Sequence, residues 1–158
     1  MTTPHLKKIV FCILLCLGVG FAASFLTMDA VNGWYRLLEK PVFNPPNWVF
    51  GPVWTALYIM MGTAAGLVWS TAATPLRRKA LWIFSIQLIL NASWSLFFFY
   101  MHSPLYGLFI IVPLLILNVW CTVLFYKIHK LSGQLMTPYV LWLAYATVLN
   151  ASIYLLNQ

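Results

Sequence analysis

Aromatic residues gather between Trp34 and Tyr58, and they are the side chains of this chain best suited to chemistry. The segment reads WYRLLEKPVFNPPNWVFGPVWTALY. Pro41, Pro45 and Pro46 remove backbone donors and force extended geometry on the residues before them, so the segment cannot form one continuous helix. It is also too aromatic for a solvated loop. We therefore expect a stiff lid or pocket wall whose rings stack against a large, flat, mostly apolar ligand.

A few neutral polar side chains could orient such a ligand. Gln87 and Asn91 lie four residues apart inside an apolar run, so on a helix they share one face. Polar groups at membrane depth are costly and normally face the interior of a helix bundle. Hydrogen bonding between helices explains these two residues as well as a ligand site does, and both alternatives stay open at this point.

The sequence lacks the residues that several other kinds of chemistry require. It contains no nucleotide-binding loop, no Ser-His-acid set and no cluster of metal ligands. Histidine can ligate haem iron, but His5, His102 and His129 fall in a tail, a turn and a basic loop, where we expect interfacial or solvated side chains. The two carboxylate side chains, Asp29 and Glu39, lie in the first loop, so no acidic proton relay crosses the bilayer. We therefore expect no metal site and no ion-driven transport through intramembrane carboxylates.

Composition places these residues in a membrane protein. Charged residues make up 7% of the chain, against about 25% in soluble domains, and hydrophobic residues make up 63%. A soluble domain of this length could not bury so much apolar surface. The net charge of +7 is compatible with nucleic-acid binding, but the basic residues sit at the ends of apolar runs and form no stripe. We expect a lipid bilayer around the chain and no nucleic-acid partner.

Apolar runs of about 20 residues predict an all-α bundle of transmembrane helices and not an outer-membrane barrel. We place five spans in a single transmembrane domain, residues 1–158, at about residues 9–28, 49–70, 80–100, 105–126 and 136–156. In the second span, Gly62 and Gly66 form a small-xxx-small pair that lets another helix approach closely. The partner helix is either within the same subunit or in a second copy, and the sequence does not distinguish the two.

The connecting segments complete the prediction. Asn32 could cap a short helix that runs through Leu38 in the first loop, which would make the lid partly helical. Thr71–Lys79 and Lys127–Leu135 are predicted to be basic loops on the side of the N-terminus. That side carries seven basic residues and the other carries two, so the positive-inside rule places the N-terminus in the cytoplasm. The first loop and the C-terminus are then outside.

Three blocks of this sequence match a known pattern. EKPVFNPPNWVFGPVWTALY, at residues 39–58, resembles the signature of the TspO/translocator protein family, the tryptophan-rich sensory proteins. QLILNASWSLFFF, at residues 87–99, and PYVLWLAYATVLN, at residues 138–150, agree with the same family. The resemblance covers almost the whole chain, including its length and its five spans.

The resemblance implies a five-helix bundle, commonly a homodimer, with a pocket closed by the first loop. Family members bind porphyrins such as protoporphyrin IX and haem without a required cofactor, and animal members also bind cholesterol and synthetic isoquinoline carboxamides. Some bacterial members degrade protoporphyrin in light with two pocket tryptophans, which match Trp54 and Trp142 here. Further matches to the family's pocket and lid are Trp34, Phe43, Asn44, Trp48, Tyr58, Gln87, Asn91 and Ala146.

Two departures from the family pattern affect the expected ligand. Phe43 stands where many members have tryptophan, which keeps a ring for stacking. In animal members a cholesterol-recognition pattern ends the fifth span, but here no lysine or arginine follows Tyr154, so we do not predict cholesterol as the ligand.

Three hypotheses about function remain at the level of the sequence. The first is a tetrapyrrole-binding protein of a bacterial cell membrane with a sensory or regulatory role. The second is an enzyme that photo-oxidises protoporphyrin IX, and the third is a transporter of porphyrins or other small apolar molecules.

Overall fold

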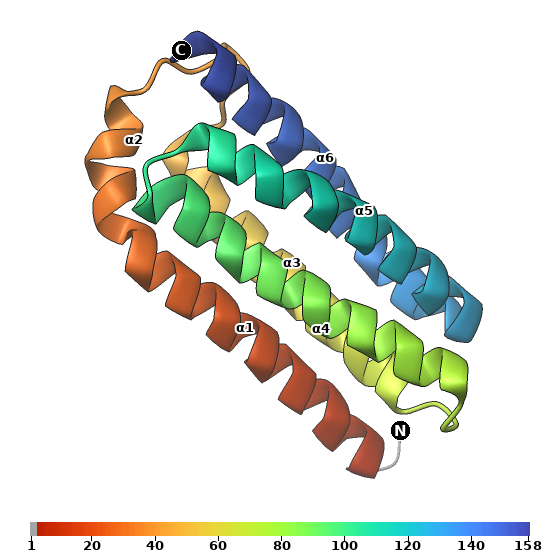
Figure 1. The fold of residues 1–158 in the computed structure, drawn as a ribbon. Helices are drawn as coiled ribbons and strands as arrows, with labels where there is room; N and C mark the ends of the chain where they lie inside the picture. The colour runs from red at the N-terminus through yellow and green to blue at the C-terminus, as the bar shows by residue number, and fades with distance from the viewer. Residues whose placement is uncertain (1–2) are drawn as a thin grey trace.

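The computed structural model describes the backbone of residues 3–158 and the side chains of residues 5–25 and 27–158. This part of the chain folds into helices joined by short connections (Figure 1). In chain order they are α1 (Thr3–Asn32), α2 (Trp34–Leu37), α3 (Asn47–Trp69), α4 (Pro75–Ser95), the π-helical turn η1 (Leu96–Tyr100), α5 (Pro104–Ile128) and α6 (Lys130–Leu156). Five segments are long and apolar enough to cross a membrane. The prediction of an all-α, five-helix membrane bundle with a partly helical first loop is confirmed.

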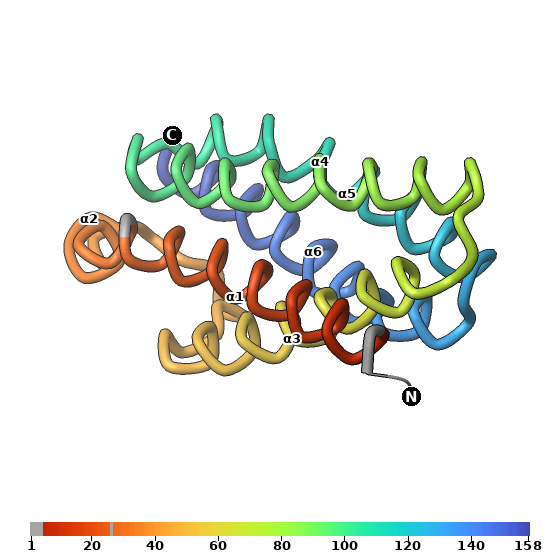
Figure 2. The backbone as a smooth tube through the Cα atoms, turned by 90° about the horizontal axis from the view of Figure 1, so that it is seen from below, coloured from red at the N-terminus to blue at the C-terminus, as the bar shows by residue number. Residues whose placement is uncertain are grey.

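The five long helices form a closed ring. α1 packs on α3, α3 on α6, α6 on α5 and α5 on α4, and α4 with η1 closes the ring against α1. Figure 2 shows α4 and α5 on one side of the bundle, α1 and α3 on the other, and α6 between them. α2, the first loop and the C-terminus lie together at one end, and the connections α3–α4 and α5–α6 lie at the opposite end (Figure 1).

Side chains next to proline start two of the helices. The hydroxyl of Thr74 accepts a hydrogen bond from the Arg77 N–H at 3.1 Å, directly before the proline that opens α4. Ser103 caps α5 in the same way by accepting from the Tyr106 N–H at 3.3 Å. Both caps satisfy a backbone donor that has no partner within the helix, and proline is well tolerated at the first helical position.

The helices extend beyond the predicted spans, and three predictions about the connections are wrong as a result. The predicted basic loop Thr71–Lys79 ends at Thr74, because α4 already begins at Pro75. α1 continues through Asn32, so Asn32 does not cap α2. Gly33 occupies that position and makes no side-chain cap. The predicted basic loop Lys127–Leu135 is reduced to His129, because α6 already begins at Lys130. Hydropathy locates the apolar part of a helix, whereas backbone hydrogen bonding continues into the polar interface wherever helix-compatible residues follow.

The small-xxx-small pair makes its contact within the subunit. A Cβ atom at Gly62 would lie 2.5 Å from the Ile13 Cα, and one at Gly66 would collide with the backbone and side chain of Ile9. The first half of α1 therefore lies directly on the second half of α3. This contact answers the question that the sequence left open, because both glycines are already covered by α1.

Candidate functional site

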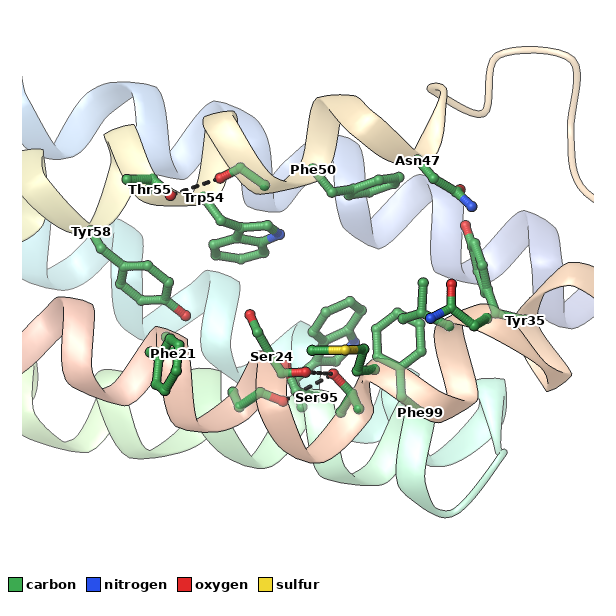
Figure 3. A pocket seen from close by; sticks show the side chains of 18 of the residues that line it. Phe21, Ser24, Tyr35, Asn47, Phe50, Trp54, Thr55, Tyr58, Ser95 and Phe99 are labelled. Carbon is green, nitrogen blue, oxygen red and sulfur yellow. Dashed lines mark hydrogen bonds between the residues drawn. The ribbon is translucent and has the colours of Figure 1, made fainter.

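A cavity of about 560 Å³ lies between α1 and α3, at the end of the bundle that carries α2 (Figure 3). Its walls come from α1, α2, α3, α4 and η1. The larger and polar side chains that line it are Phe21, Ser24, Thr27, Tyr35, Asn47, Phe50, Trp54, Thr55, Tyr58, Trp94 and Phe99. In Figure 3 the rings of Trp54 and Tyr58 reach from α3 into the space that faces α1, and Tyr58 and Tyr35 stand at opposite ends of it.

The cavity exists because α1 and α3 touch closely at one end and separate toward the other (Figure 2). Glycines hold the two backbones together at the end opposite α2. Beyond this contact α3 presents Phe50, Trp54 and Tyr58, whose rings are too large for such a close approach. Gly20 makes the last close contact, since a Cβ atom there would collide with the Tyr58 ring. Tyr58 therefore forms the floor where the two helices begin to separate.

One wall of the cavity is a pair of stacked rings. The Trp54 and Tyr58 centroids lie 5.6 Å apart at an interplanar angle of 29°. Behind this pair, the Trp54 ring meets Trp142 of α6 edge to face at 6.3 Å and Tyr139 at 6.2 Å. Offset stacking and edge-to-face contacts of this kind fix the rings without filling the space in front of them. The wall thus offers a flat, rigid aromatic surface to a ligand.

Asn91 holds this wall in place. The Tyr58 hydroxyl donates to the Asn91 Oδ1 at 2.6 Å, and the Asn91 Nδ2 donates to the Tyr139 hydroxyl at 2.6 Å. All three side chains are buried. Asn91, which the family resemblance assigns to the ligand, does not line the cavity in this structure and orients Tyr58 from behind.

Trp142 and Ala146, two further residues predicted to bind ligand, line a second and much smaller cavity of about 30 Å³. Phe50 and Trp54 border both cavities, so the two spaces share one aromatic partition. The Trp142 Nε1 is buried and has no hydrogen-bond partner within the described part of the chain.

Gln87 lies apart from both cavities. Its side chain is 0% exposed, and neither its amide oxygen nor its amide nitrogen has a hydrogen-bond partner among the described residues. Asn118 of α5 is also buried, and its amide oxygen and nitrogen have no hydrogen-bond partner among the described residues. The structure therefore does not place Gln87 where a ligand in the main cavity would touch it.

The first loop is fastened to α6 and does not cover the cavity as a whole. The Tyr145 hydroxyl donates to the Phe43 carbonyl at 2.7 Å, and the Asn157 side chain bonds the backbone N–H and carbonyl of Glu39 at 3.0 and 2.9 Å. Of the four residues predicted for the lid, Asn44 accepts from the Tyr35 hydroxyl at 3.0 Å, and Trp48 is 76% exposed.

The other predicted lid residues also lie outside the cavity wall. Trp34 packs on Phe98 and His102, with centroids 5.8 and 4.9 Å away, and the Phe43 ring meets Tyr145 at 6.3 Å. Tyr35 of α2 and Asn47, the first residue of α3, do reach the cavity. The aromatic loop thus acts on the cavity through Tyr35 and through the position of α3.

Tyr35 is a titratable group of the first loop whose environment alters its pKa. Burial, with a smaller contribution from Tyr145, raises the pKa of the Tyr35 phenol to about 12. The neutral phenol can then donate to Asn44 throughout the physiological range. Burial also lowers the pKa of Lys40, whose ammonium donates to the Leu38 carbonyl and lies 4.7 Å from the centre of the Tyr35 ring.

The sequence analysis missed the part of the wall that α1 provides. Ser24 and Thr27 line the cavity, and their spacing in an otherwise apolar run was a signal for an interior-facing stripe. The Thr27 hydroxyl donates to the Ala23 carbonyl of its own helix. Ser24 and Thr55 are exposed on opposite sides of the gap, so the cavity opens sideways between α1 and α3.

Comparison with known proteins gives one consistent result. The model of the TspO/MBR family matches residues 12–156. The chain is 42% identical over 154 residues to the tryptophan-rich protein TspO of Archaeoglobus fulgidus, covering 97% of this chain and 99% of that protein. It is 33% identical over 159 residues to the translocator protein of Homo sapiens (98% and 92%) and 33% identical over 124 residues to the tryptophan-rich sensory protein of Cereibacter sphaeroides (78% and 77%).

Proposed function

Because the chain belongs to the TspO/MBR family, we propose that it is a membrane-embedded protein that binds a tetrapyrrole, protoporphyrin IX or haem, in the cavity between α1 and α3. Its role would be sensory or regulatory in porphyrin metabolism or stress, in line with the name of the Cereibacter sphaeroides relative. The observation that carries the proposal is the stacked Trp54–Tyr58 wall in a cavity of about 560 Å³. Cavities that hold ligands of this class are mostly apolar and measure about 300–1,000 Å³.

The charge distribution indicates how such a ligand would lie. Among the described residues that line the cavity, none is charged, so the carboxylates of a porphyrin are best placed at its mouth. At the α2 end, Asn32 and Asn47 line the mouth, and Arg36 and Lys40 follow in the loop. The ring would then lie against Trp54 with its carboxylates toward α2.

The cavity suits the ring of a porphyrin better than the iron of haem. Its described wall contains no histidine, cysteine or carboxylate, and the candidate iron ligands on it are the Met28 thioether and the phenols of Tyr35 and Tyr58. Both hydroxyls already donate hydrogen bonds, Tyr35 to Asn44 and Tyr58 to Asn91. Binding of a metal-free porphyrin is therefore the form of the proposal that the residues support best.

The test is a binding titration that follows porphyrin fluorescence in purified protein. Trp54→Ala removes the ring from the cavity wall and should weaken porphyrin binding at least tenfold, or about 1.4 kcal/mol. Trp120→Ala is the matched control, because Trp120 lies on α5 away from the cavity and stacks under Lys79. Equal affinities for the two variants would place the porphyrin elsewhere.

Light-driven degradation of protoporphyrin IX is a second candidate function, favoured by the contact between Trp54 and Trp142 at 6.3 Å. An excited porphyrin against Trp54 would take one electron from its indole, and dioxygen would add to a bridging carbon of the reduced ring. Return of one electron from this adduct to the Trp54 radical, directly or by way of Trp142, would restore both tryptophans. Cleavage of the O–O bond would then leave two carbonyl groups in an opened ring, so that only porphyrin and dioxygen are consumed. Trp142→Phe keeps a ring but is much harder to oxidise, so it should slow light-driven porphyrin loss while leaving binding nearly unchanged. Loss at the wild-type rate in both Trp54→Phe and Trp142→Phe would exclude this function.

The orientation in the membrane and the assembly state also belong to the proposal. Seven of the nine basic residues lie at the end opposite α2, which supports a cytoplasmic N-terminus and an extracytoplasmic first loop and C-terminus. A topology reporter fused after Gln158 should then read as extracytoplasmic. A homodimer would use a surface other than Gly62 and Gly66, because α1 already covers both.

A further inference from the structure

A second hollow in the surface lies at the end of the molecule opposite the cavity. There a groove of about 260 Å³ runs along the turn between α3 and α4. Its wall includes Trp69, Thr74, Arg77, Arg78, Trp82 and Ser85. The groove combines two guanidinium groups with two indole rings and continues onto the side of α4, so it has a cationic part and an apolar part.

The positive charge at this end has no counterpart in the protein. Seven of the nine basic residues lie here, at the start of α1, at the α3–α4 turn and at the α5–α6 turn. Asp29 and Glu39 are the acidic side chains of the chain, and both lie at the α2 end together with the C-terminus. Within residues 3–158 the cations at this end therefore have no carboxylate side chain to neutralise them. The compensating anion must come from the surroundings.

Most of the nearby cations already have partners, but Arg78 is free to bind one. Arg77 donates to the carbonyls of Trp69, at 3.3 Å, and Thr71, at 2.5 Å, and Lys8 donates to the same Trp69 carbonyl at 3.4 Å. Lys79 lies 4.9 Å above the Trp120 ring. Arg78 is exposed, and its side chain makes no hydrogen bond to another residue of the described chain. Arg77 is thus held rigidly at the groove with donors to spare, and Arg78 stands beside it.

The apolar part of the groove selects a lipid over a soluble anion. Trp82 is 65% exposed one turn below the arginines, on the side of α4 that enters the bilayer, and Leu81 and Ser85 continue the same surface. Indole rings favour the membrane interface, and basic pockets at the ends of transmembrane helices suit anionic headgroups. We propose that this groove binds an anionic phospholipid, with its phosphate between Arg77 and Arg78 and an acyl chain along Trp82.

Native mass spectrometry of the full chain, with phosphatidylglycerol and phosphatidylcholine in competition, tests this proposal. Wild-type protein should retain phosphatidylglycerol preferentially, and Arg78→Gln should lower that preference at least tenfold. Lys130→Gln is the matched control, since it removes one exposed positive charge from the same end but outside the groove. General attraction to a basic surface is worth about 1 kcal/mol per residue, or roughly fivefold, wherever the charge sits.

The possible outcomes distinguish a specific lipid site from general attraction to a basic surface and from a site for a soluble anion. A much larger loss in Arg78→Gln than in Lys130→Gln supports the groove. Equal losses would reduce the effect to surface electrostatics and overturn the proposal, as would a wild-type protein without lipid preference. Displacement of the lipid by inorganic phosphate in excess would assign the groove to a soluble anion instead. A further variant, Trp82→Ala, should weaken lipid retention without changing the charge.

Discussion

Asn91 gives the sharpest test of the site, because the family resemblance and the structure assign it different roles. The resemblance places it against the ligand, whereas the structure places it between the hydroxyls of Tyr58 and Tyr139 with two hydrogen bonds of 2.6 Å. If the structure is right, changing Asn91 alters the stability of the wall first and ligand affinity only as a consequence. The variants Tyr58→Phe and Asn91→Leu, and a combined variant that joins both changes to Tyr139→Phe, separate these two roles.

The expected magnitudes follow from burial. Tyr58→Phe keeps the ring stacked on Trp54 but leaves the Asn91 oxygen without its donor in a buried site. An unsatisfied buried group costs about 1–3 kcal/mol, and hydrogen bonds between membrane helices average about 0.6 kcal/mol with a maximum near 1.7. We therefore expect Tyr58→Phe to lower the free energy of unfolding by about 1–2 kcal/mol. Asn91→Leu should cost a similar amount because two hydroxyls lose their partner.

The combined variant Tyr58→Phe/Asn91→Leu/Tyr139→Phe removes every member of the network, leaves no polar group unpaired and should recover most of the lost stability. The assay is thermal unfolding of the purified protein in detergent, together with a porphyrin titration at a temperature where all variants are folded. Affinity in the combined variant should stay within a few fold of wild type, since the rings that form the wall remain. A large loss of affinity in Asn91→Leu without a loss of stability would refute this reasoning and return Asn91 to the ligand.

Three further changes test other parts of the molecule. Gly66→Leu places a side chain against the backbone of α1 and should destabilise the protein by about 1–3 kcal/mol or more, as measured by thermal unfolding. Gly18→Ala is the control and should not destabilise the protein, because a Cβ atom there meets no atom within 4 Å. Burial raises the pKa of Tyr35 to about 12 in the folded loop, so its contribution to stability should be complete below pH 10 and lost between pH 10 and 12. Tyr35→Phe should remove this alkaline transition in the tryptophan fluorescence. Replacing Pro45 and Pro46 with glycine should weaken porphyrin binding in a fluorescence titration, because a more flexible loop loses more conformational entropy when the ligand orders it. Unchanged affinity would show that the loop only connects α1 to α3.

The helices of this protein can be predicted from sequence because each contains a long apolar run that is bounded by polar residues. Composition alone excludes a soluble domain, and Pro41, Pro45, Pro46, Pro75 and Pro104 mark connections or the helix that follows one. The errors fall at the interface, as at Lys130, where helical hydrogen bonding continues after hydropathy has fallen. They also fall at Asn32, where a residue suited to capping a helix instead ends one. Both errors concern the residue at which a helix begins or ends, which local propensity determines only weakly.

The site is harder to predict because its shape depends on contacts between helices. Trp54, Tyr58 and Trp142 can be proposed from the aromatic blocks and the resemblance, and the structure brings their rings into one cluster, with Trp54 and Tyr58 on the cavity wall and Trp142 behind Trp54. Ser24 and Thr27 of α1 are harder to assign, because two small polar residues in an otherwise apolar helix are a weak signal of the side that faces its neighbour. Only the position of α1 on α3 determines that these two residues line the cavity.

The cavity follows from a difference in side-chain size along one helix. α3 carries glycine where it meets the first half of α1, at Gly62 and Gly66, and aromatic rings where it faces the second half, at Phe50, Trp54 and Tyr58. Two straight helices in contact at one end must then diverge at the other, and the space between them grows toward α2. The size of the side chains along α3 thus determines both where its backbone approaches α1 and where the cavity opens. Widening the glycine contact should change the shape of the cavity from a distance, and shrinking the rings should change its wall while leaving the contact intact.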